Sequence, residues 1–302
     1  MTNLLLLLLL LLLFTLLFLN CRGDIYVKPT QGKHKIDPME AALFKTVQHV
    51  VSIRSGHRLS YWGDNHFCGG FLITASLVIT SECCVVSKIE VISTKGLKNL
   101  VVAVGLMERL STPLPNQLIE VEKYWLSSKT DTRMPHDLAI LLLKNKVPML
   151  RFFRYLQQLP LREIPDQVRC RTMGWGRLYP HGPFSNELLT MDLETINARH
   201  CVRQYGESFD PDMQICTVSM DFRGPMCQGD VGSPLLCGNV LYGVGGLINV
   251  SQCIGYEPIV FSSVYKHVRF IQDIMAGGAG VIRRRASDHL AMLLMTLTLG
   301  LC

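Results

Sequence analysis

Cysteines are the residues of this 302-residue chain whose number and spacing point most directly to chemistry. No Cys-x-x-Cys pair is followed by a second such pair or by a His-x-x-x-His, so we expect no metal site and no cofactor. In a secreted chain this density of cysteine indicates disulfide bonds instead of thiol chemistry. The eleven cysteines are an odd number and stand at positions 21, 68, 83, 84, 170, 201, 216, 227, 237, 253 and 302.

Both ends of the chain resemble processing signals. Residues 4–19 form an apolar run, which predicts a signal peptide over residues 1–23, cleaved before Asp24; an uncleaved amino-terminal anchor is the alternative. Small residues at 276–280, a polar spacer and the apolar tail 290–302 have the pattern of a glycosylphosphatidylinositol (GPI) attachment signal. We therefore expect residues 277–302 to be replaced by a lipid at Gly277 or a neighbour, the alternative being a tail without function. The predicted location is extracellular, at the outer cell surface.

Composition narrows the class of protein. The formal charge is +6; removing residues 1–23 takes away one positive charge and removing 277–302 takes away two, which leaves +3. So small a charge gives no reason to expect a nucleic-acid partner. No interior segment reaches the ~20 apolar residues of a membrane-spanning helix, and 48% hydrophobic residues exclude a disordered chain.

Hydrophobic patterning predicts an all-β protein with one helix at its end. Short β-branched runs separated by turn residues indicate many short strands, which favour barrels or a sandwich. Val264, Val268, Ile271 and Met275 recur at helical spacing. The runs that predict strands lie at residues 66–80, 100–105, 138–144, 241–247 and 259–264.

Five motifs carry a family resemblance across residues 36–275. In their order and spacing they resemble the chymotrypsin-like (trypsin-like) serine proteases. The resemblance implies two six-stranded antiparallel β-barrels with a carboxyl-terminal α-helix, over residues 36–276, preceded by a short pro-like segment at 24–35. The motifs are Cys68-Gly69-Gly70, Ser81-Glu82-Cys83-Cys84, His136-Asp137-Leu138-Ala139, Gly174-Trp175-Gly176 and Gly229-Asp230-Val231-Gly232-Ser233.

The resemblance also implies a disulfide framework. Once Cys21 and Cys302 are removed with the processed ends, Cys83 is left unpaired in this scheme. The implied bridges are Cys68–Cys84, Cys170–Cys237, Cys201–Cys216 and Cys227–Cys253.

At the catalytic positions the chain departs from the family pattern. The family mechanism needs a nucleophilic serine, a histidine base and an orienting aspartate. Asp137 is present, but Cys83 stands at the histidine position and Val231 at the serine position. We therefore expect no proteolysis by the family mechanism. Three alternatives remain: Glu82 at the histidine position if the alignment shifts by one, Ser233 as a displaced nucleophile, and Cys83 as a cysteine nucleophile.

The substrate-binding positions are altered as well. The backbone amides of Gly229 and Val231 could still donate the hydrogen bonds of an oxyanion hole, because these donors do not depend on side chains. By the resemblance, Pro225 lies at the base of the primary specificity pocket, and Leu247 and Ile259 lie on its walls. A branched side chain in place of the usual wall glycine predicts an occluded pocket.

Activation and glycosylation give two further expectations. Lys35-Ile36 lies where the family's activating cleavage falls and Asp230 is present, but the glycines that follow the cut are missing and Pro38 stiffens the segment. Asn249 begins an Asn-x-Ser glycosylation signal.

The sequence thus predicts a catalytically inactive, secreted serine protease homologue that acts by binding a protein. The expected partner is an active protease, an inhibitor or a receptor. The alternatives are a hydrolase that uses displaced residues and a structural or adhesion module that retains the fold.

Overall fold

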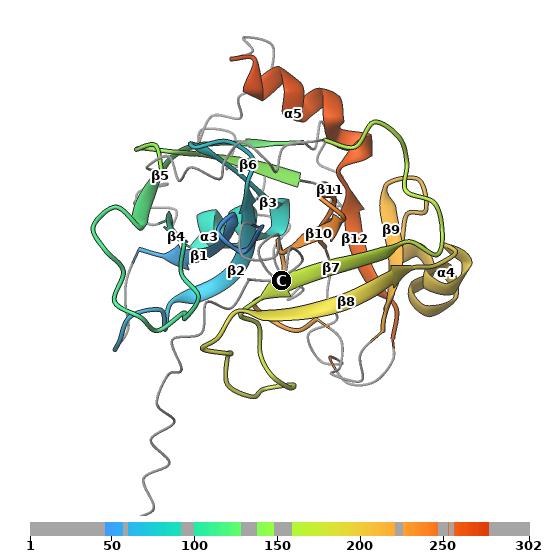
Figure 1. Cartoon of the computed structure of the whole chain (residues 1–302), viewed down its shortest axis with the longest axis horizontal. Helices are drawn as coiled ribbons and strands as arrows, with labels where there is room; N and C mark the ends of the chain where they lie inside the picture. The colour runs from blue at the N-terminus through green and yellow to red at the C-terminus, as the bar shows by residue number, and fades with distance from the viewer. Residues whose placement is uncertain are drawn as a thin grey trace, which may run out of the picture. The chain divides into compact units, whose positions relative to one another are not determined.

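The computed structural model describes residues 46–56, 60–91, 100–127, 138–147, 159–220, 226–246, 253 and 257–277. Twelve strands form two closed antiparallel barrels, in the orders β1-β2-β3-β6-β5-β4 and β10-β11-β12-β9-β8-β7 (Figure 1). The predicted fold is therefore confirmed. The first barrel consists of β1 (Val50–Ser55), β2 (His66–Leu72), β3 (Leu77–Ser81), β4 (Leu100–Val104), β5 (Leu118–Leu126) and β6 (Leu138–Leu143). The second consists of β7 (Arg169–Gly174), β8 (Leu189–Thr195), β9 (Gln214–Ser219), β10 (Pro234–Cys237), β11 (Val240–Gly245) and β12 (Ile259–Ser263).

Strand β6 shows how the sequence builds the core. Its side chains alternate between two hydrophobic clusters, as the two-residue period of a strand requires. Ala139 and Leu141 pack into the cluster of the first barrel. Leu138 and Ile140 pack into a cluster that also holds Trp175 and residues of the second barrel. A strand that is buried on both faces therefore joins the two barrels through side-chain packing.

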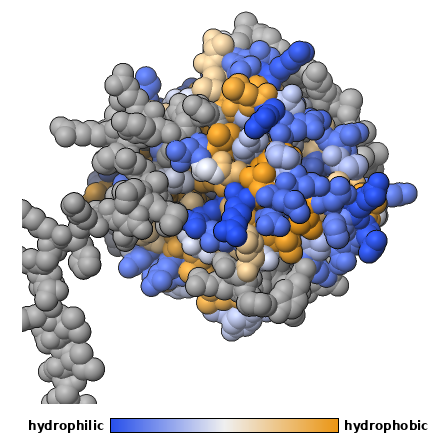
Figure 2. Space-filling view, turned by 45° about the vertical axis from the view of Figure 1, so that its right-hand side comes forward, coloured by the Kyte–Doolittle hydropathy of each residue, from blue (hydrophilic) through white to orange (hydrophobic). Residues whose placement is uncertain are grey.

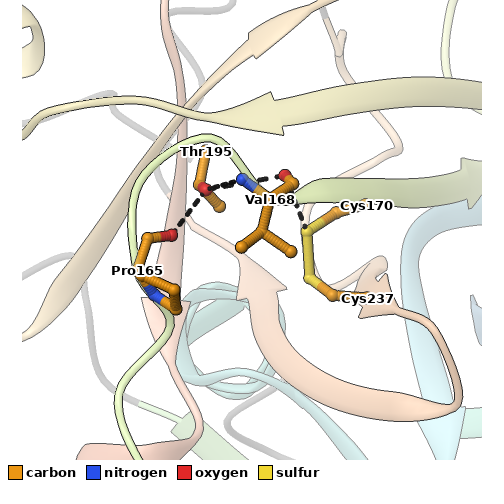
Figure 3. Close-up of a disulfide and its surroundings, with 5 residues drawn as sticks. All are labelled: Pro165, Val168, Cys170, Thr195 and Cys237. Carbon is orange, nitrogen blue, oxygen red and sulfur yellow. Dashed lines mark hydrogen bonds between the residues drawn. A yellow bond between two sulfur atoms is a disulfide. The ribbon is translucent and has the colours of Figure 1, made fainter.

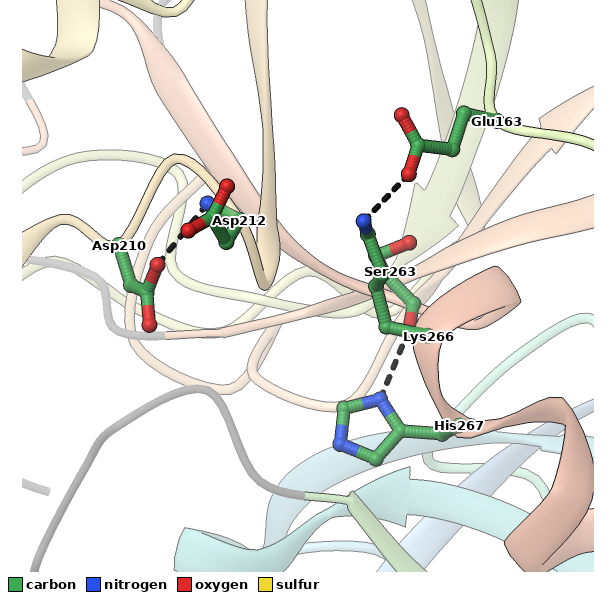
Figure 4. Close-up of polar contacts among 6 residues, drawn as sticks. All are labelled: Glu163, Asp210, Asp212, Ser263, Lys266 and His267. Atoms are coloured by element: carbon green, nitrogen blue, oxygen red, sulfur yellow. Dashed lines mark hydrogen bonds and ion pairs between the residues drawn. The ribbon is translucent and has the colours of Figure 1, made fainter.

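The predicted helix is present as α5 (Val268–Met275), which follows a 3₁₀ turn, η4 (Tyr265–His267). Its buried residues Ile271 and Ile274 join the cluster between the barrels. Lys266 forms an ion pair with Glu163, and His267 Nδ1 donates to the carbonyl of Ser263 at 2.8 Å (Figure 4). Among the described residues, further helices are α3 (Glu82–Val91), α4 (Arg199–Tyr205) and the 3₁₀ turn η3 (Gly206–Ser208).

The four disulfides implied by the resemblance are all present: Cys68–Cys84, Cys170–Cys237, Cys201–Cys216 and Cys227–Cys253. Figure 3 shows the second of these, which joins the neighbouring strands β7 and β10. Thr195 orders the chain beside it, because its hydroxyl donates to the Pro165 carbonyl and accepts from the Val168 amide.

The surface mixes polar and apolar side chains, and on the face in Figure 2 hydrophobic residues lie between hydrophilic ones. Within the described residues, no helix has the length and apolar character needed to cross a membrane.

Candidate functional site

The Cys68–Cys84 disulfide fixes the register of the site. Cys84 pairs with Cys68, so Cys83 is the residue immediately before the bridge. The alternative that places Glu82 at the histidine position requires Cys83, and not Cys84, to pair with Cys68. That alternative is therefore wrong. The same bridge borders the Val231 turn: Cys84 Sγ lies 3.6 Å from the Val231 carbonyl oxygen, which accepts a 2.7 Å hydrogen bond from the Gly69 amide.

Cys83 is itself disulfide-bonded, which corrects the prediction of an unpaired thiol. Its partner lies outside the described residues. The prediction failed because the cysteine count assumed that Cys21 and Cys302, the two cysteines left over, are removed before pairing. A bridged sulfur carries no thiolate, so in this state Cys83 is not a nucleophile.

Val231 occupies the turn where the resemblance places the serine nucleophile. Its partly buried side chain packs against the hydrophobic cluster of the first barrel. The turn is closed by hydrogen bonds from Asp230 N to Cys227 O (2.9 Å) and from Gly232 N to Gly245 O (2.8 Å). The frame of the site is therefore formed around an aliphatic side chain that can neither attack a carbonyl nor donate a proton.

Ser233, the displaced-nucleophile alternative, is fully buried, with 0% of its surface exposed. A β-carbon on Gly69 would lie 2.5 Å from Ser233 Oγ, and one on Gly174 would lie 3.0 Å from it. The hydroxyl accordingly points into the packed layer between β2 and β7, where a substrate cannot reach it. Within the described part of the chain it has no hydrogen-bond partner, so no base activates it.

The backbone donors of an oxyanion hole remain. The amides of Gly229 and Val231 donate no hydrogen bond to any described residue. Gly229 has φ of +99°, and a β-carbon there would lie 2.6 Å from the ring of Phe184, so only glycine fits. The two amides of the predicted remnant are thus free of described acceptors, and the side chain beside them is that of Val231.

The Asp230 carboxylate explains the Gly174-Trp175-Gly176 motif. Its oxygens accept hydrogen bonds from the amides of Gly176 (2.8 Å) and Cys227 (3.1 Å). A β-carbon on either Gly174 or Gly176 would lie 2.0 Å from these oxygens, so both positions must be glycine. Burial raises the pKa of Asp230 to about 6, although both amide hydrogen bonds lower it.

Ile259, which the sequence places on the pocket wall, is buried in β12 and belongs with Met226 to the hydrophobic cluster of the second barrel. Met226 reaches far enough that a β-carbon on Gly245 would lie 2.9 Å from its terminal methyl. The side chains of Met226 and Ile259 are only 3% and 5% exposed. Sequence reasoning missed Met226; the available signal was a large apolar residue directly before Cys227.

One serine–histidine hydrogen bond exists among the described residues, and sequence reasoning missed it. Ser52 Oγ lies 2.8 Å from His66 Nδ1 and accepts from Arg54 Nε at 2.9 Å. All three side chains are buried. Burial, aided by the charges of Arg109 and Arg54, lowers the pKa of His66 to about 3. This neutral, enclosed histidine is a packing and hydrogen-bonding residue, because no substrate can reach it.

Several predicted site residues lie outside the described residues: Asp137, Pro225, Leu247, Asn249 and Ile36, together with residues 1–45 and 278–302. Gly277, the predicted lipid attachment point, follows α5 with φ of +76° and has no atom within 4 Å of the place of a β-carbon. Within the described chain, no cluster of His, Cys, Asp and Glu could hold a metal ion.

Comparison with known proteins defines the family. The trypsin family model matches residues 41–271, and the chain therefore belongs to the trypsin-like serine protease family. It is 29% identical to duodenase-1 of Bos taurus over 216 residues, which cover 70% of this chain and 80% of the relative. It is 30% identical to granzyme-like protein 1 of Rattus norvegicus over 212 residues, which cover 69% and 79%.

A solved structure supports the same fold. Mouse neuropsin, a serine protease expressed in the limbic system of the brain, matches with a TM-score of 0.62 and 22% sequence identity. The match covers 76% of this chain and 96% of the neuropsin chain. The four disulfides are consistent with the extracellular setting in which such bonds persist.

Proposed function

We propose that this protein is a non-catalytic serine protease homologue that acts outside the cell by binding another protein. The observation that carries the proposal is Val231, held at the nucleophile turn by the Gly69 amide and packed into the first barrel. Loss of the nucleophile or the histidine costs a serine protease about a million-fold in turnover. Here Cys83 replaces the histidine too, and its sulfur is engaged in a disulfide.

The specificity pocket supports the same proposal. A trypsin-like enzyme recognises one substrate side chain in this pocket. Met226 and Ile259 are buried members of one hydrophobic cluster, and in this proposal they fill the pocket. Removing such side chains from a packed cluster leaves a cavity, which is costly, so the filled state is the stable one. With the pocket filled, a partner must contact the outer surface of the barrels. That partner is an active protease, an inhibitor or a receptor.

The proposal has two further parts. A lipid near Gly277 attaches the protein to the cell surface, and Asn249 carries an N-glycan. Helix α5 ends only two residues before Gly277, so the anchor would hold the barrels close to the membrane. Release by phosphatidylinositol-specific phospholipase C tests the anchor, and retention of the intact 290–302 tail on mass spectrometry would contradict it.

Labelling with a fluorophosphonate probe tests the absence of a reactive serine. The purified protein is first treated with trypsin to cut after Lys35, and bovine trypsin serves as the positive control. We expect the control to label to completion and this protein to remain unlabelled. A labelled serine peptide would establish the rival reading, a hydrolase that uses displaced residues.

A further inference from the structure

Three surface segments, residues 60–65, 105–117 and 177–189, lie together where the two barrels meet. The buried side chain of Arg109 joins them: its guanidinium donates to the carbonyls of Gly63 (2.6 Å), Ser185 (2.9 Å) and Phe184 (3.3 Å). The Met107 carbonyl accepts from the Leu188 amide at 2.8 Å. In Figure 1 the loop between β4 and β5 and the hairpin between β7 and β8 accordingly approach each other. We call this surface the Arg109 face.

The Arg109 face is rich in exposed apolar side chains. Eleven large apolar side chains of the described residues are exposed, and seven of them lie in these three segments. The segments make up only about a sixth of the described residues. Enrichment of a surface in exposed apolar side chains, with Tyr and Met among them, is typical of protein-binding surfaces. The seven are Tyr61, Met107, Leu110, Leu114, Leu178, Tyr179 and Leu189.

Two glutamates stand opposite each other among these apolar side chains, and Glu108 Oε2 accepts a hydrogen bond from Ser111 Oγ at 3.1 Å. Glu108 and Glu187 are directly opposite in an isolated antiparallel bridge, and both residues are exposed. Like charges in opposite positions of an antiparallel pair repel each other. Arg109 does not compensate them, because its guanidinium is directed inward to the carbonyls of Gly63 and Ser185. Within the described residues neither glutamate forms an ion pair.

We infer that the Arg109 face is the docking surface for a partner protein that presents a lysine or arginine flanked by apolar side chains. The basic group lies between Glu108 and Glu187, and the flanking side chains cover Met107, Leu110 and Leu189. The face is already ordered by the Arg109 hydrogen bonds, so little conformational entropy is lost on binding. This inference rests on the proposed binding function and names the chemistry of the partner.

A peptide display library tests it without a known partner. Immobilised protein selects from peptides whose centre is apolar–X–apolar, with X equal to Lys, Arg, Ser or Glu. We expect enrichment of X equal to Lys or Arg, and a loss of affinity of tenfold or more for the double variant Glu108→Lys, Glu187→Lys. The matched control, Glu207→Lys on the exposed η3 turn, should bind as the wild type does. The double variant, whose two positions now carry positive charge, should select peptides in which X is Glu.

Other outcomes overturn the inference. Equal binding by the wild type and the charge-reversed variant, or selection without a basic residue, excludes the glutamate pair as the recognition element. Dimerisation of the wild type that is lost in Leu110→Ser would assign the face to a second copy of this chain.

Met107→Ser tests the apolar part of the face. It should weaken the affinity for the selected peptides by about tenfold, and unchanged affinity would contradict the inference. If the protein binds peptides selectively but also labels with fluorophosphonate, this inference stands and the proposed lack of catalysis is wrong. If the protein is unlabelled but selects no peptide, the lack of catalysis stands and this inference is wrong.

Discussion

The Val231 turn and the Arg109 face are both held by hydrogen bonds that involve the backbone, but they differ in the side chains that they expose. At the turn, hydrogen bonds between Gly69, Val231, Asp230 and Gly176 preserve the frame of a serine protease, but the side chains inside it are aliphatic, buried or bridged. At the Arg109 face, hydrogen bonds from one buried arginine order three loops whose apolar side chains are exposed. The difference supports the proposal that the turn serves the stability of the fold and that binding uses the Arg109 face.

The largest effect is expected from the arginine that orders the face. Arg109→Met keeps most of the apolar stem but leaves the carbonyls of Phe184 and Ser185 without a described donor and removes one of the two donors to Gly63, so it should lower the free energy of unfolding by about 3 kcal/mol or more. Urea unfolding at neutral pH measures it. Arg171→Met is the control, because its half-exposed ion pair with Asp192 should contribute less than about 1 kcal/mol. Equal effects of the two variants would show that Arg109 does not order the face.

Met226, which in our proposal fills the specificity pocket, gives the next largest effect on stability. Met226→Ala removes a buried side chain beside Gly245 and Ile259 and should cost about 2–4 kcal/mol of unfolding free energy. Benzene should restore part of this stability by entering the apolar cavity. Met275→Ala, at a side chain that is 41% exposed, should change stability by less than about 0.5 kcal/mol. If the two variants behave alike, Met226 does not fill the pocket.

A smaller, pH-dependent effect is expected from His66. Its pKa is about 3 in the folded protein and near 6.5 in the unfolded chain, so the unfolded state binds more protons between these values. The stability contributed by the neutral ring is therefore complete above pH 6.5 and falls by up to about 1.4 kcal/mol per pH unit as the pH drops toward 3. His66→Gln, which retains a hydrogen-bonding group toward Ser52, should remove this slope.

Asp230 acts in the opposite direction and must be separated from His66. Its pKa is raised from 3.8 to about 6, so its stabilising contribution is complete below pH 3.8 and is lost as the pH rises through 6. The difference between wild-type and His66→Gln unfolding curves, measured from pH 4 to 7, cancels the Asp230 contribution. A flat difference would contradict the buried, neutral histidine.

The fold and its disulfides could be predicted because they rest on local motifs. Each motif is a short stretch of sequence whose residue types can be recognised without the structure: the Cys-Gly-Gly run, the Gly-Trp-Gly run and the Val231 turn. The close approach of Asp230 explains why Gly174 and Gly176 are glycines. Met226 and Arg109 could not be found this way. The contacts of Arg109 join it to residues 46 to 76 positions away, and nothing in its own neighbourhood signals burial. Cys83 was misjudged because its bridge depends on a cysteine that processing was expected to remove.

The initial rate of peptide cleavage shows whether the preserved frame around Val231 performs any catalysis. Wild type cut after Lys35 is measured on a peptide library beside Val231→Ser and the double variant Cys83→His, Val231→Ser, which also gives up the Cys83 bridge. We predict no cleavage above the enzyme-free background for the wild type, and none for Val231→Ser, because the histidine base is still absent. Wild-type cleavage that survives repurification and disappears in Ser233→Ala would show instead that the protein is a protease with Ser233 as its nucleophile.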